Sequence, residues 1–329
     1  MASAKLQIGL LGTARIAPEA LIKPAALIDG VEVAAIAARD SARAREFANA
    51  NKIPRVVADY NRLITDPDLD AIYNPLPNSL HCEWTIRALR AGKHVLCEKP
   101  IASNAAEAER MAEAAEQTGL LLIEAFHYYY HPLARRVREI LRDGTLGRLS
   151  HVEGHFSVPF IPATDIRHDF SLAGGATMDL GCYPLHMIRH FTGATPSVKS
   201  ARARVGAPGI DIAMEAELEL PGGVEARMSC SMEPTAPLTV TFEAHGERGS
   251  LSVVNPLAPH RGHQFTLKTA GGERREIFEG ESTYTHQLRA FEAAVRGGPA
   301  MPTDGRDGII SMRIIDDVYR RAGLPVRGA

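Results

Sequence analysis

Two groups of residues in this sequence have the types and the spacing that proton-transfer chemistry requires. The first is Glu98-Lys99-Pro100, which directly follows the apolar, strand-like segment 94–97. A strand that ends on proline cannot extend its ladder, and ligands bind at the carboxyl ends of parallel strands. We therefore expect the Lys99 ammonium at the mouth of a parallel sheet, with a cis peptide bond as a candidate before Pro100. A surface ion pair between Glu98 and Lys99 is the alternative interpretation.

The second group lies between Gly175 and His190. If a helix begins at Gly175, then Asp179, Tyr183 and His186 follow one another at spacings of four and three and share one face. Polar residues on one face of an apolar helix need either partners or a cavity, so this face is a site or a satisfied buried network. His186 and His190 also have the spacing of a metal pair, but no acidic residue completes that pattern, and we assign no metal.

A turn typical of dinucleotide binding follows the first apolar segment, Leu6 to Leu11. It reads Gly12-Thr13-Ala14-Arg15-Ile16 and leads into a helix predicted to reach Ile28. Such a turn needs a glycine for its tight bend, a small residue near the phosphates, and helix amides that face their charge. Ala14 and Ala17 stand where further glycines are usual, so the motif is weak when taken alone.

Two further strand ends carry residues suited to the same crevice. The segment 31–38 ends at Arg39, whose guanidinium suits a 2'-phosphate and favours NADP, whereas the adjacent Asp40 keeps NAD open. The strand 71–74 leads into Leu76-Pro77-Asn78 and His81, which are predicted to face the same crevice as Gly12. The alternative is that Asn78 and His81 only help to begin a helix.

Composition and length restrict the class of protein. The chain has 329 residues, enough for two domains, with 45% hydrophobic residues, 23% charged residues and a net charge of -2. This balance favours a small-molecule partner and predicts no nucleic acid and no membrane partner. Residues 1–5 leave no room for a leader, and four scattered cysteines predict buried thiols, so we expect a cytoplasmic protein.

The order of elements predicts an α/β fold with two domains. Strands and helices alternate through residues 1–125, which indicates a Rossmann-type, doubly wound parallel sheet that binds a dinucleotide. In residues 126–329 strands follow one another with few helices between them, which indicates a mostly antiparallel sheet with one face free to meet a partner; we expect this second domain to bind substrate and to form the oligomer. The strands expected in the second domain are 149–156, 197–204, 210–220, 224–232, 238–244, 251–254 and 264–268.

Together these motifs resemble the glucose-fructose oxidoreductase, inositol dehydrogenase and rhizopine-catabolism (Gfo/Idh/MocA) family over nearly the whole chain. The resemblance implies a Rossmann domain, a second α/β domain with an open sheet, and NAD(P)-dependent oxidation of sugars or related polyols. It also implies a homodimer or higher homo-oligomer formed through that sheet. Tyr183 stands where many members carry histidine, as in the branch of glucose-fructose oxidoreductase, dimeric dihydrodiol dehydrogenase and anhydrofructose reductase.

The resemblance also implies roles for individual residues. Lys99 matches the catalytic lysine of the family and Asp179 its helix aspartate, while Arg167 and Tyr284 are expected at the nicotinamide half of the cofactor. We assign Glu98 to holding the cofactor loop. Tyr129 stands where the branch usually has arginine, which is a departure from its usual substrates. The residues predicted to face substrate are Lys99, Phe126, Tyr129, Asp179, Tyr183 and His186.

The chemistry follows from the residue types. Removing hydride from a carbinol carbon requires a base at the hydroxyl oxygen, and an ordinary tyrosine with a pKa of about 10 is too weak a base. A nearby ammonium favours the phenolate, so we expect Tyr183 to exchange the proton, Lys99 to polarise the oxygen, and Asp179 to orient Lys99 or a hydroxyl. The alternatives are a non-catalytic NAD(P)-binding regulator and a metal-dependent lyase or hydrolase that uses His186 and His190.

Overall fold

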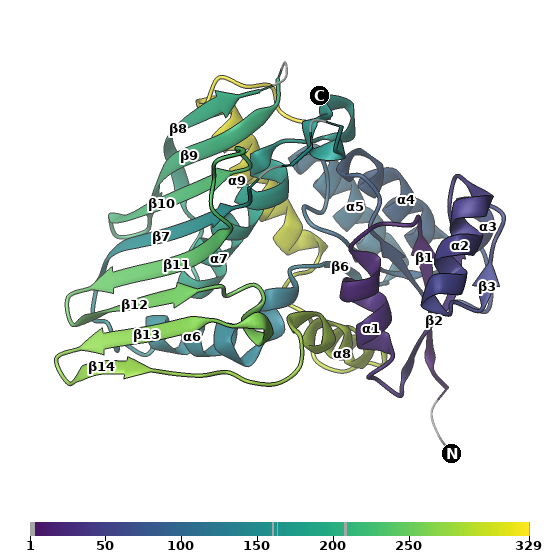
Figure 1. The fold of residues 1–329 in the computed structure, drawn as a ribbon, viewed down its shortest axis with the longest axis horizontal. Coiled ribbons are helices and arrows are strands. Elements are labelled where there is room, and N and C mark those ends of the chain that lie inside the picture. The colour runs from purple at the N-terminus through teal and green to yellow at the C-terminus, as the bar shows by residue number, and fades with distance from the viewer. Residues whose placement is uncertain (1–3, 160, 163, 207–208, 329) are drawn as a thin grey trace. The chain divides into compact units, whose positions relative to one another are not determined.

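The chain divides into two units in a computed structural model that describes residues 4–159, 161–162, 164–206 and 209–328 (Figure 1). The first unit contains the described residues up to His127 together with Tyr284–Ile309, and the second contains Tyr128–Thr283 and the described residues from Ile310. The division predicted at 125/126 lies close to the first transition but does not include the return of 284–309 to the first unit. The prediction that residues 1–5 leave no room for a leader falls partly on residues 1–3, which lie outside the described residues.

The first unit is built on a parallel six-stranded sheet in the order β3-β2-β1-β4-β5-β6. Apart from the short edge strand β3, its strands are mostly apolar and buried, as expected for a sheet covered on both faces. The order reverses between β1 and β4, which places a topological switch point at their carboxyl ends. This confirms the predicted doubly wound sheet. The strands are β1 (Leu6–Leu11), β2 (Val31–Ala37), β3 (Arg55–Val56), β4 (Ala71–Asn74), β5 (His94–Cys97) and β6 (Leu122–Glu124).

Polar side chains cap the N-termini of several helices of the first unit. Asp40 caps one helix by accepting from the amides of Ala42 and Arg43, and Asn104 caps another. The helix predicted to reach Ile28 is instead a π-helical turn followed by a short α-helix that ends at Ala25. The helices are η1 (Pro18–Ile22), α1 (Lys23–Ala25), α2 (Ser41–Asn51), α3 (Tyr60–Ile64), α4 (Asn78–Arg90), α5 (Ala105–Thr118) and α8 (Thr283–Val295).

The segment 284–309 completes the first unit. Arg296 of the turn after α8 donates to the carbonyls of Ala4 and Gly30, at 2.8 and 3.2 Å. Farther along, the amide of Glu124 donates to the Thr303 carbonyl at 2.7 Å, beside β6 at the end of the sheet. A late part of the sequence therefore covers a sheet edge that would otherwise present unpaired backbone groups.

The second unit is built on an eight-stranded sheet in the order β14-β13-β12-β11-β7-β10-β9-β8 (Figure 1). Its paired strands run antiparallel except β7 and β10, which run parallel, and this confirms a mostly antiparallel sheet. Strand β14 was not predicted. The strands are β7 (Leu149–Ser157), β8 (Ser197–Val205), β9 (Asp211–Leu220), β10 (Val224–Ser231), β11 (Thr239–Gly246), β12 (Gly249–Val254), β13 (Gln264–Thr269) and β14 (Gly272–Arg275).

One face of this sheet is apolar and the other is charged. In β9, Met214, Ala216 and Leu218 are buried, whereas the alternating residues Glu215 and Glu217 are exposed. Helix α7 packs on β7 so closely that a Cβ at Gly154 would lie 2.9 Å from Pro184 Cβ. The helices are η2 (His127–Tyr130), α6 (Pro132–Arg142), η3 (Ile166–His168), η4 (Phe170–Leu172), η5 (Thr177–Gly181), α7 (Cys182–Thr192), η6 (Pro259–Arg261) and α9 (Gly305–Arg321), which begins in the first unit.

Two global features bear on the predicted class of protein. Within the described part of the chain, every helix is too short or too polar to cross a lipid bilayer. Cys82, Cys97, Cys182 and Cys230 are buried and carry free thiols, as the sequence predicts.

Candidate active site

The predicted cofactor turn lies at the carboxyl end of β1. Gly12 has a φ of +77°, and its amide donates to the Ala37 carbonyl of β2 at 2.7 Å. A Cβ at this position would lie 3.1 Å from Leu76 Cδ2, so both the bend and the close approach require glycine. Thr13 and Ala14 are half-buried, whereas Arg15 and Ile16 are exposed. The turn is therefore open on one side and braced by Leu76 on the other.

Two charged residues just beyond the carboxyl end of β2 have different surroundings. Arg39 is exposed, while the Asp40 carboxylate accepts from the amides of Ala42 and Arg43 at 2.8 and 3.2 Å. These hydrogen bonds hold the pKa of Asp40 below its ordinary value. Asp40 thus begins α2, and Arg39 is the charged side chain that remains available at this strand end.

His81 connects two of the predicted loops. Its Nδ1 lies 2.9 Å from the Pro100 carbonyl and its Nε2 lies 2.7 Å from the Leu76 carbonyl. The two carbonyls favour the charged ring, but complete burial outweighs them and lowers the pKa of His81 to about 4. The ring is therefore enclosed between backbone groups and positions both loops, while Pro77 and Asn78 remain half-exposed beside it.

The Glu98-Lys99-Pro100 loop is held by buried partners on neighbouring strands. Glu98 is buried and accepts from the Tyr73 hydroxyl at 2.6 Å and from the Lys99 amide at 3.3 Å. The amide of Ile101, just after the loop, donates to Glu124 of β6 at 2.8 Å. The Lys99-Pro100 bond is cis, as predicted, and Lys99 itself is half-buried. Glu98 thus fixes the loop through Tyr73, a partner that sequence reasoning missed.

Of two tyrosines near these loops, Tyr73 could have been found from the sequence and Tyr60 could not. Tyr73 is a hydroxyl-bearing residue inside the otherwise apolar strand β4, and a fully buried hydroxyl requires a partner. Tyr60 lies near the cofactor turn, where a Cβ at Gly12 would be 3.6 Å from its hydroxyl, but its segment carries no motif. Tyr73 is therefore the predictable one, because a polar hydroxyl is unusual inside an apolar strand.

Aromatic residues occupy the carboxyl end of β6. Phe126 is fully buried, and the ring of His127 lies 3.9 Å, centroid to centroid, from the ring of Tyr284 at the start of α8. Tyr284 is thereby located at the same edge of the first sheet as Gly12, Arg39 and Lys99. The first unit therefore gathers the predicted cofactor residues along one edge, although Phe126 is enclosed in the core.

In the second unit, Asp179 pairs with Arg167. The Arg167 Nε lies 2.5 Å from Asp179 Oδ2, and its Nη1 lies 2.9 Å from Asp165 Oδ1. These two carboxylates raise the pKa of Arg167 above its ordinary value, with Asp179 as the largest cause. The Asp179 carboxylate is about one-fifth exposed and therefore combines a fixed partner with access to solvent. Asp179 thus has an arginine as its direct partner.

Tyr183 lies in the first turn of α7, directly after the π-helical segment η5 that carries Asp179. It is buried, and its ring lies 5.7 Å from Phe156 and 6.2 Å from Tyr128, centroid to centroid. π-helical turns are rare and are frequent at functional sites. The predicted helix is confirmed in position, but its first turn is wider than the α-helix from which the shared face was derived.

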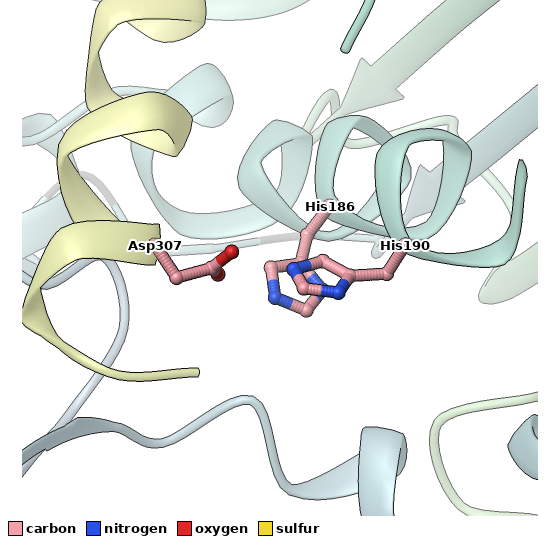
Figure 2. A group of neighbouring side chains, drawn as sticks. All are labelled: His186, His190 and Asp307. Carbon is pink, nitrogen blue, oxygen red and sulfur yellow. The ribbon is translucent and has the colours of Figure 1, made fainter. Parts of the chain in front are cut away.

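His186 is enclosed within the second unit. Its Nδ1 lies 2.6 Å from the Tyr128 hydroxyl, and burial lowers its pKa well below the ordinary value. Figure 2 shows its ring stacked on that of His190, one turn along α7, and the centroids are 3.9 Å apart. Asp307, drawn with them, belongs to the first unit. His186 is thus part of a buried aromatic cluster, which was the alternative to a substrate contact.

Tyr129 belongs to the same cluster and is half-buried. The Arg138 guanidinium lies over its ring at 3.9 Å from the centroid, and Arg138 Nη1 donates to the Tyr129 carbonyl at 3.0 Å. A cation at this distance is attracted by the ring face. An arginine is thus adjacent to position 129, although it comes from α6 and not from position 129 itself.

The first-unit edge fits a dinucleotide. Gly12 leaves room where a side chain would clash with Leu76, and Arg39 supplies an exposed charge at the neighbouring strand end. The residues that would hold the cofactor are Gly12, Thr13, Ala14, Arg15, Ile16, Arg39, Leu76, Pro77, Asn78, Glu98 and Lys99, with Tyr284 beside them and His81 behind them.

Comparison with known proteins gives matches over both units. Residues 6–126 match a family model described as "Oxidoreductase family, NAD-binding Rossmann fold", and residues 134–252 match the "GFO/IDH/MocA C-terminal domain". The sequence is 36% identical over 321 residues to D-xylose 1-dehydrogenase (NADP(+)) 2 of Haloferax volcanii, which covers 96% of this chain and 97% of that protein. It is 36% identical over 306 residues to trans-1,2-dihydrobenzene-1,2-diol dehydrogenase of Bos taurus, with 89% of each chain covered.

Among solved structures, the fold resembles a 3-ketoreductase from Actinomadura kijaniata in complex with NADP and TDP-benzene. The TM-score is 0.89, the sequence identity is 31%, and the match covers 96% of this chain and 97% of the ketoreductase. Other structures of that ketoreductase carry a substitution of one tyrosine or of one lysine.

Proposed function

The chain belongs to the Gfo/Idh/MocA family of NAD(P)-dependent oxidoreductases, and from this premise we propose that it uses Lys99 and Tyr183 to act on a carbinol or carbonyl oxygen. The family match and the named relatives confirm the predicted enzyme class, an NAD(P)-dependent dehydrogenase or reductase. They favour it over a non-catalytic regulator and over a metal-dependent lyase or hydrolase.

The proposed roles follow from what each side chain can do. A nicotinamide held at this edge would supply the acceptor or donor of the hydride. Tyr183 exchanges the hydroxyl proton, and the Lys99 ammonium stabilises negative charge on the same oxygen. Arg167 pairs with Asp179 and so fixes the position of that carboxylate one helical turn before Tyr183.

Spacing along the chain supports the choice of these two residues. In the solved structures of the 3-ketoreductase, the substituted lysine and tyrosine are 84 positions apart, as Lys99 and Tyr183 are. Both chains also cover each other almost completely. We therefore regard Lys99 and Tyr183 as the corresponding pair in this protein.

We propose a sugar, an anhydrosugar or a cyclic diol as substrate. The relatives named above include a D-xylose dehydrogenase and a dihydrodiol dehydrogenase, and all these compounds carry the neighbouring hydroxyl groups that a polar pocket can recognise. Phe126 and His186 are enclosed in their own units, so Tyr129, Asp179 and Tyr183 are the stronger candidates for substrate contacts.

We propose NADP as the preferred cofactor. The exposed Arg39 guanidinium suits a 2'-phosphate, and Asp40, the acidic residue that would favour NAD, is engaged at the start of α2. We also propose a cytoplasmic location, supported by four free buried thiols, and a homodimer formed through the charged face of the second sheet.

One observation carries the proposed function: the residues predicted to bind the cofactor lie at the carboxyl edge of a parallel sheet whose order reverses at β1 and β4. The test is titration with NADPH and NADH, followed through quenching of Trp84, the single tryptophan. Turnover is then measured with D-xylose, other pyranoses, anhydrosugars and trans-cyclic diols. We expect NADPH to bind more tightly than NADH and at least one compound to be oxidised. Failure to bind either nucleotide would overturn the proposal.

A further inference from the structure

We propose that Asp211 and Arg327 are positioning residues that hold Asp179 and Arg167 in the arrangement the reaction requires. The pair lies in the second unit, far from Asp179 in the sequence, and neither residue belongs to a motif. This inference rests on the proposed function, because it concerns the segment that carries Asp179 and Tyr183. The hydrogen bonds from which we argue it all lie within the second unit.

Asp211 caps the helical segment η5 from a neighbouring strand. Its carboxylate is fully buried at the start of β9, and Oδ2 accepts from the Thr177 amide at 2.7 Å and from the Thr177 hydroxyl at 2.6 Å. The first amides of a helix lack intrahelical partners, and a carboxylate there satisfies a donor and complements the helix dipole. Asp211 therefore supplies the cap that η5 lacks within its own sequence.

Arg327 holds that carboxylate and a second backbone group at the same time. Its Nη2 lies 2.7 Å from Asp211 Oδ1, and its Nε donates to the Gly174 carbonyl at 2.7 Å. Its guanidinium lies 4.1 Å from the ring centroid of Tyr319, whose hydroxyl donates to Asp211 Oδ1 at 3.0 Å. Asp211 thus accepts four hydrogen bonds, two from the segment it holds and two from the residues that hold it.

Gly175 is the point at which this network meets the candidate site. Its φ is +128°, and a Cβ there would lie 2.2 Å from Asp211 Oδ1 and 2.9 Å from Arg327 Nη2. Its amide donates to the Arg167 carbonyl at 2.9 Å, and its carbonyl accepts from the Asp179 amide at 3.1 Å. One residue is therefore bonded to both partners of the Arg167–Asp179 ion pair and touches the buried pair behind them.

Stability alone is a weak reason for such a pair. Two charges taken out of water lose hydration that their attraction only partly replaces, and apolar residues of the same volume often stabilise a core as well or better. An apolar pair could not accept from Thr177 or donate to Gly174. The directional bonds are what this pair adds, and three of them end on Gly174 and Thr177, in the segment before Asp179.

The test is hydrogen exchange of the full-length protein, measured by mass spectrometry on peptides that cover 174–183. Arg327→Lys keeps the charge but removes the planar fork that reaches both Gly174 and Asp211. We expect hydrogen exchange in 174–183 to become about tenfold faster, and exchange in the strands of the second sheet to stay unchanged. If Arg327→Lys does not fold, Tyr319→Phe removes a single donor to Asp211, and we expect an increase of about threefold.

The matched control is Arg136→Lys, since Arg136 Nε pairs with Glu276 at 3.0 Å elsewhere in the same unit. It should leave exchange in 174–183 as in the wild type. Unchanged exchange in Arg327→Lys and Tyr319→Phe, or an equal rise across the whole unit, would overturn the inference.

Kinetics separate this inference from the proposed function. With any compound of the panel that is turned over, Arg327→Lys should lower kcat about tenfold and shift the pH profile of kcat, with NADPH affinity within about twofold of the wild type. A purely structural pair would lower only the amount of active enzyme. If the wild type binds no nucleotide, the proposed function fails. If kcat is unchanged in Arg327→Lys but lost in Tyr183→Phe, only the positioning role is rejected.

Discussion

The two units hold their candidate site residues in different ways. In the first unit, Gly12, Arg39 and Lys99 each lie within two residues of a strand end, so the sheet brings them to one edge. In the second unit, Asp179 and Tyr183 lie on a helical segment held by Arg167 and by a buried pair more than 30 residues away in sequence. The first arrangement depends mainly on backbone order, with Glu98 and His81 bracing two of the loops, and the second depends on specific side-chain bonds.

This difference predicts different responses to substitution. At a strand end, a changed side chain leaves its neighbours in place, because the ladder still fixes the backbone. In a network of buried hydrogen bonds, removal of one group leaves its partners unsatisfied and affects the others. A single substitution in the first unit should therefore impair one function, whereas a single substitution in the network of the second unit should impair several together.

The largest expected effect comes from one substitution in each unit. Lys99→Met and Tyr183→Phe should each lower kcat about 10² to 10⁴-fold, because each removes a group that acts on the reacting oxygen. Affinity for NADPH, measured by fluorescence quenching, should stay within about threefold for Tyr183→Phe. If the two residues act on the same oxygen, the double variant should lose much less than the product of the two single effects. Near-normal turnover in either single variant would reject the assignment.

How much of each unit could be predicted follows from the same difference. The strands β1, β4 and β5 were located to the residue, because apolar runs bounded by glycine, proline and charge are local signals. Lys99 and Arg39 followed from them. The role of His81 did not follow, because its two carbonyl partners come from separate loops and only the folded chain brings them together.

The second unit was predictable in its sheet but not in its polar interior. Alternation in β9 and β10 is visible in the sequence, yet nothing near Arg327 indicates that it is fully buried, since arginine is usually exposed. Asp211 opens a strand, where a charged residue is ordinarily solvated. The partner of Asp179 was also unpredictable, because Arg167 was identified by resemblance and expected at the cofactor.

A second prediction tests whether the first unit really depends on its backbone alone. His81 is neutral in the folded protein down to about pH 4 but titrates near 6.5 when unfolded, so the unfolded state takes up the proton between these values. The free energy of unfolding is therefore highest above pH 6.5 and falls by about 3 kcal/mol towards pH 4 from this residue. In His81→Gln this component should be absent, as measured by urea unfolding across that range.

The control for this prediction is His245→Gln, at an exposed position of the second sheet. It should retain the pH dependence of the wild type. An unchanged pH dependence in His81→Gln would mean that the ring titrates freely and does not tie Leu76 to Pro100. In that case the two loops are positioned by their strands only, which would strengthen the contrast between the units.

The third prediction concerns a residue that should lose one function only. Arg39→Ala should weaken NADPH binding about 30-fold, since a hydrogen-bonded charge is removed from the 2'-phosphate, and should leave NADH binding unchanged. Arg45→Ala, on the exposed face of the adjacent helix, is the matched control and should alter neither affinity. Equal losses for both nucleotides would show that Arg39 contacts a part of the cofactor that NADH shares.

The smallest expected effect distinguishes two roles for the neighbour of Arg39. If Asp40 serves only to begin α2, Asp40→Ala should lower Tm by about 2 °C, because the amides of Ala42 and Arg43 lose their acceptor. Asp40→Ser, which can still cap the helix, should retain the Tm, and both variants should bind NADH as the wild type does. Weaker NADH binding in Asp40→Ser would instead assign the carboxylate to the ribose. Asp40 would then both cap a helix and bind the cofactor, so that a strand-end residue of the first unit would also carry more than one function.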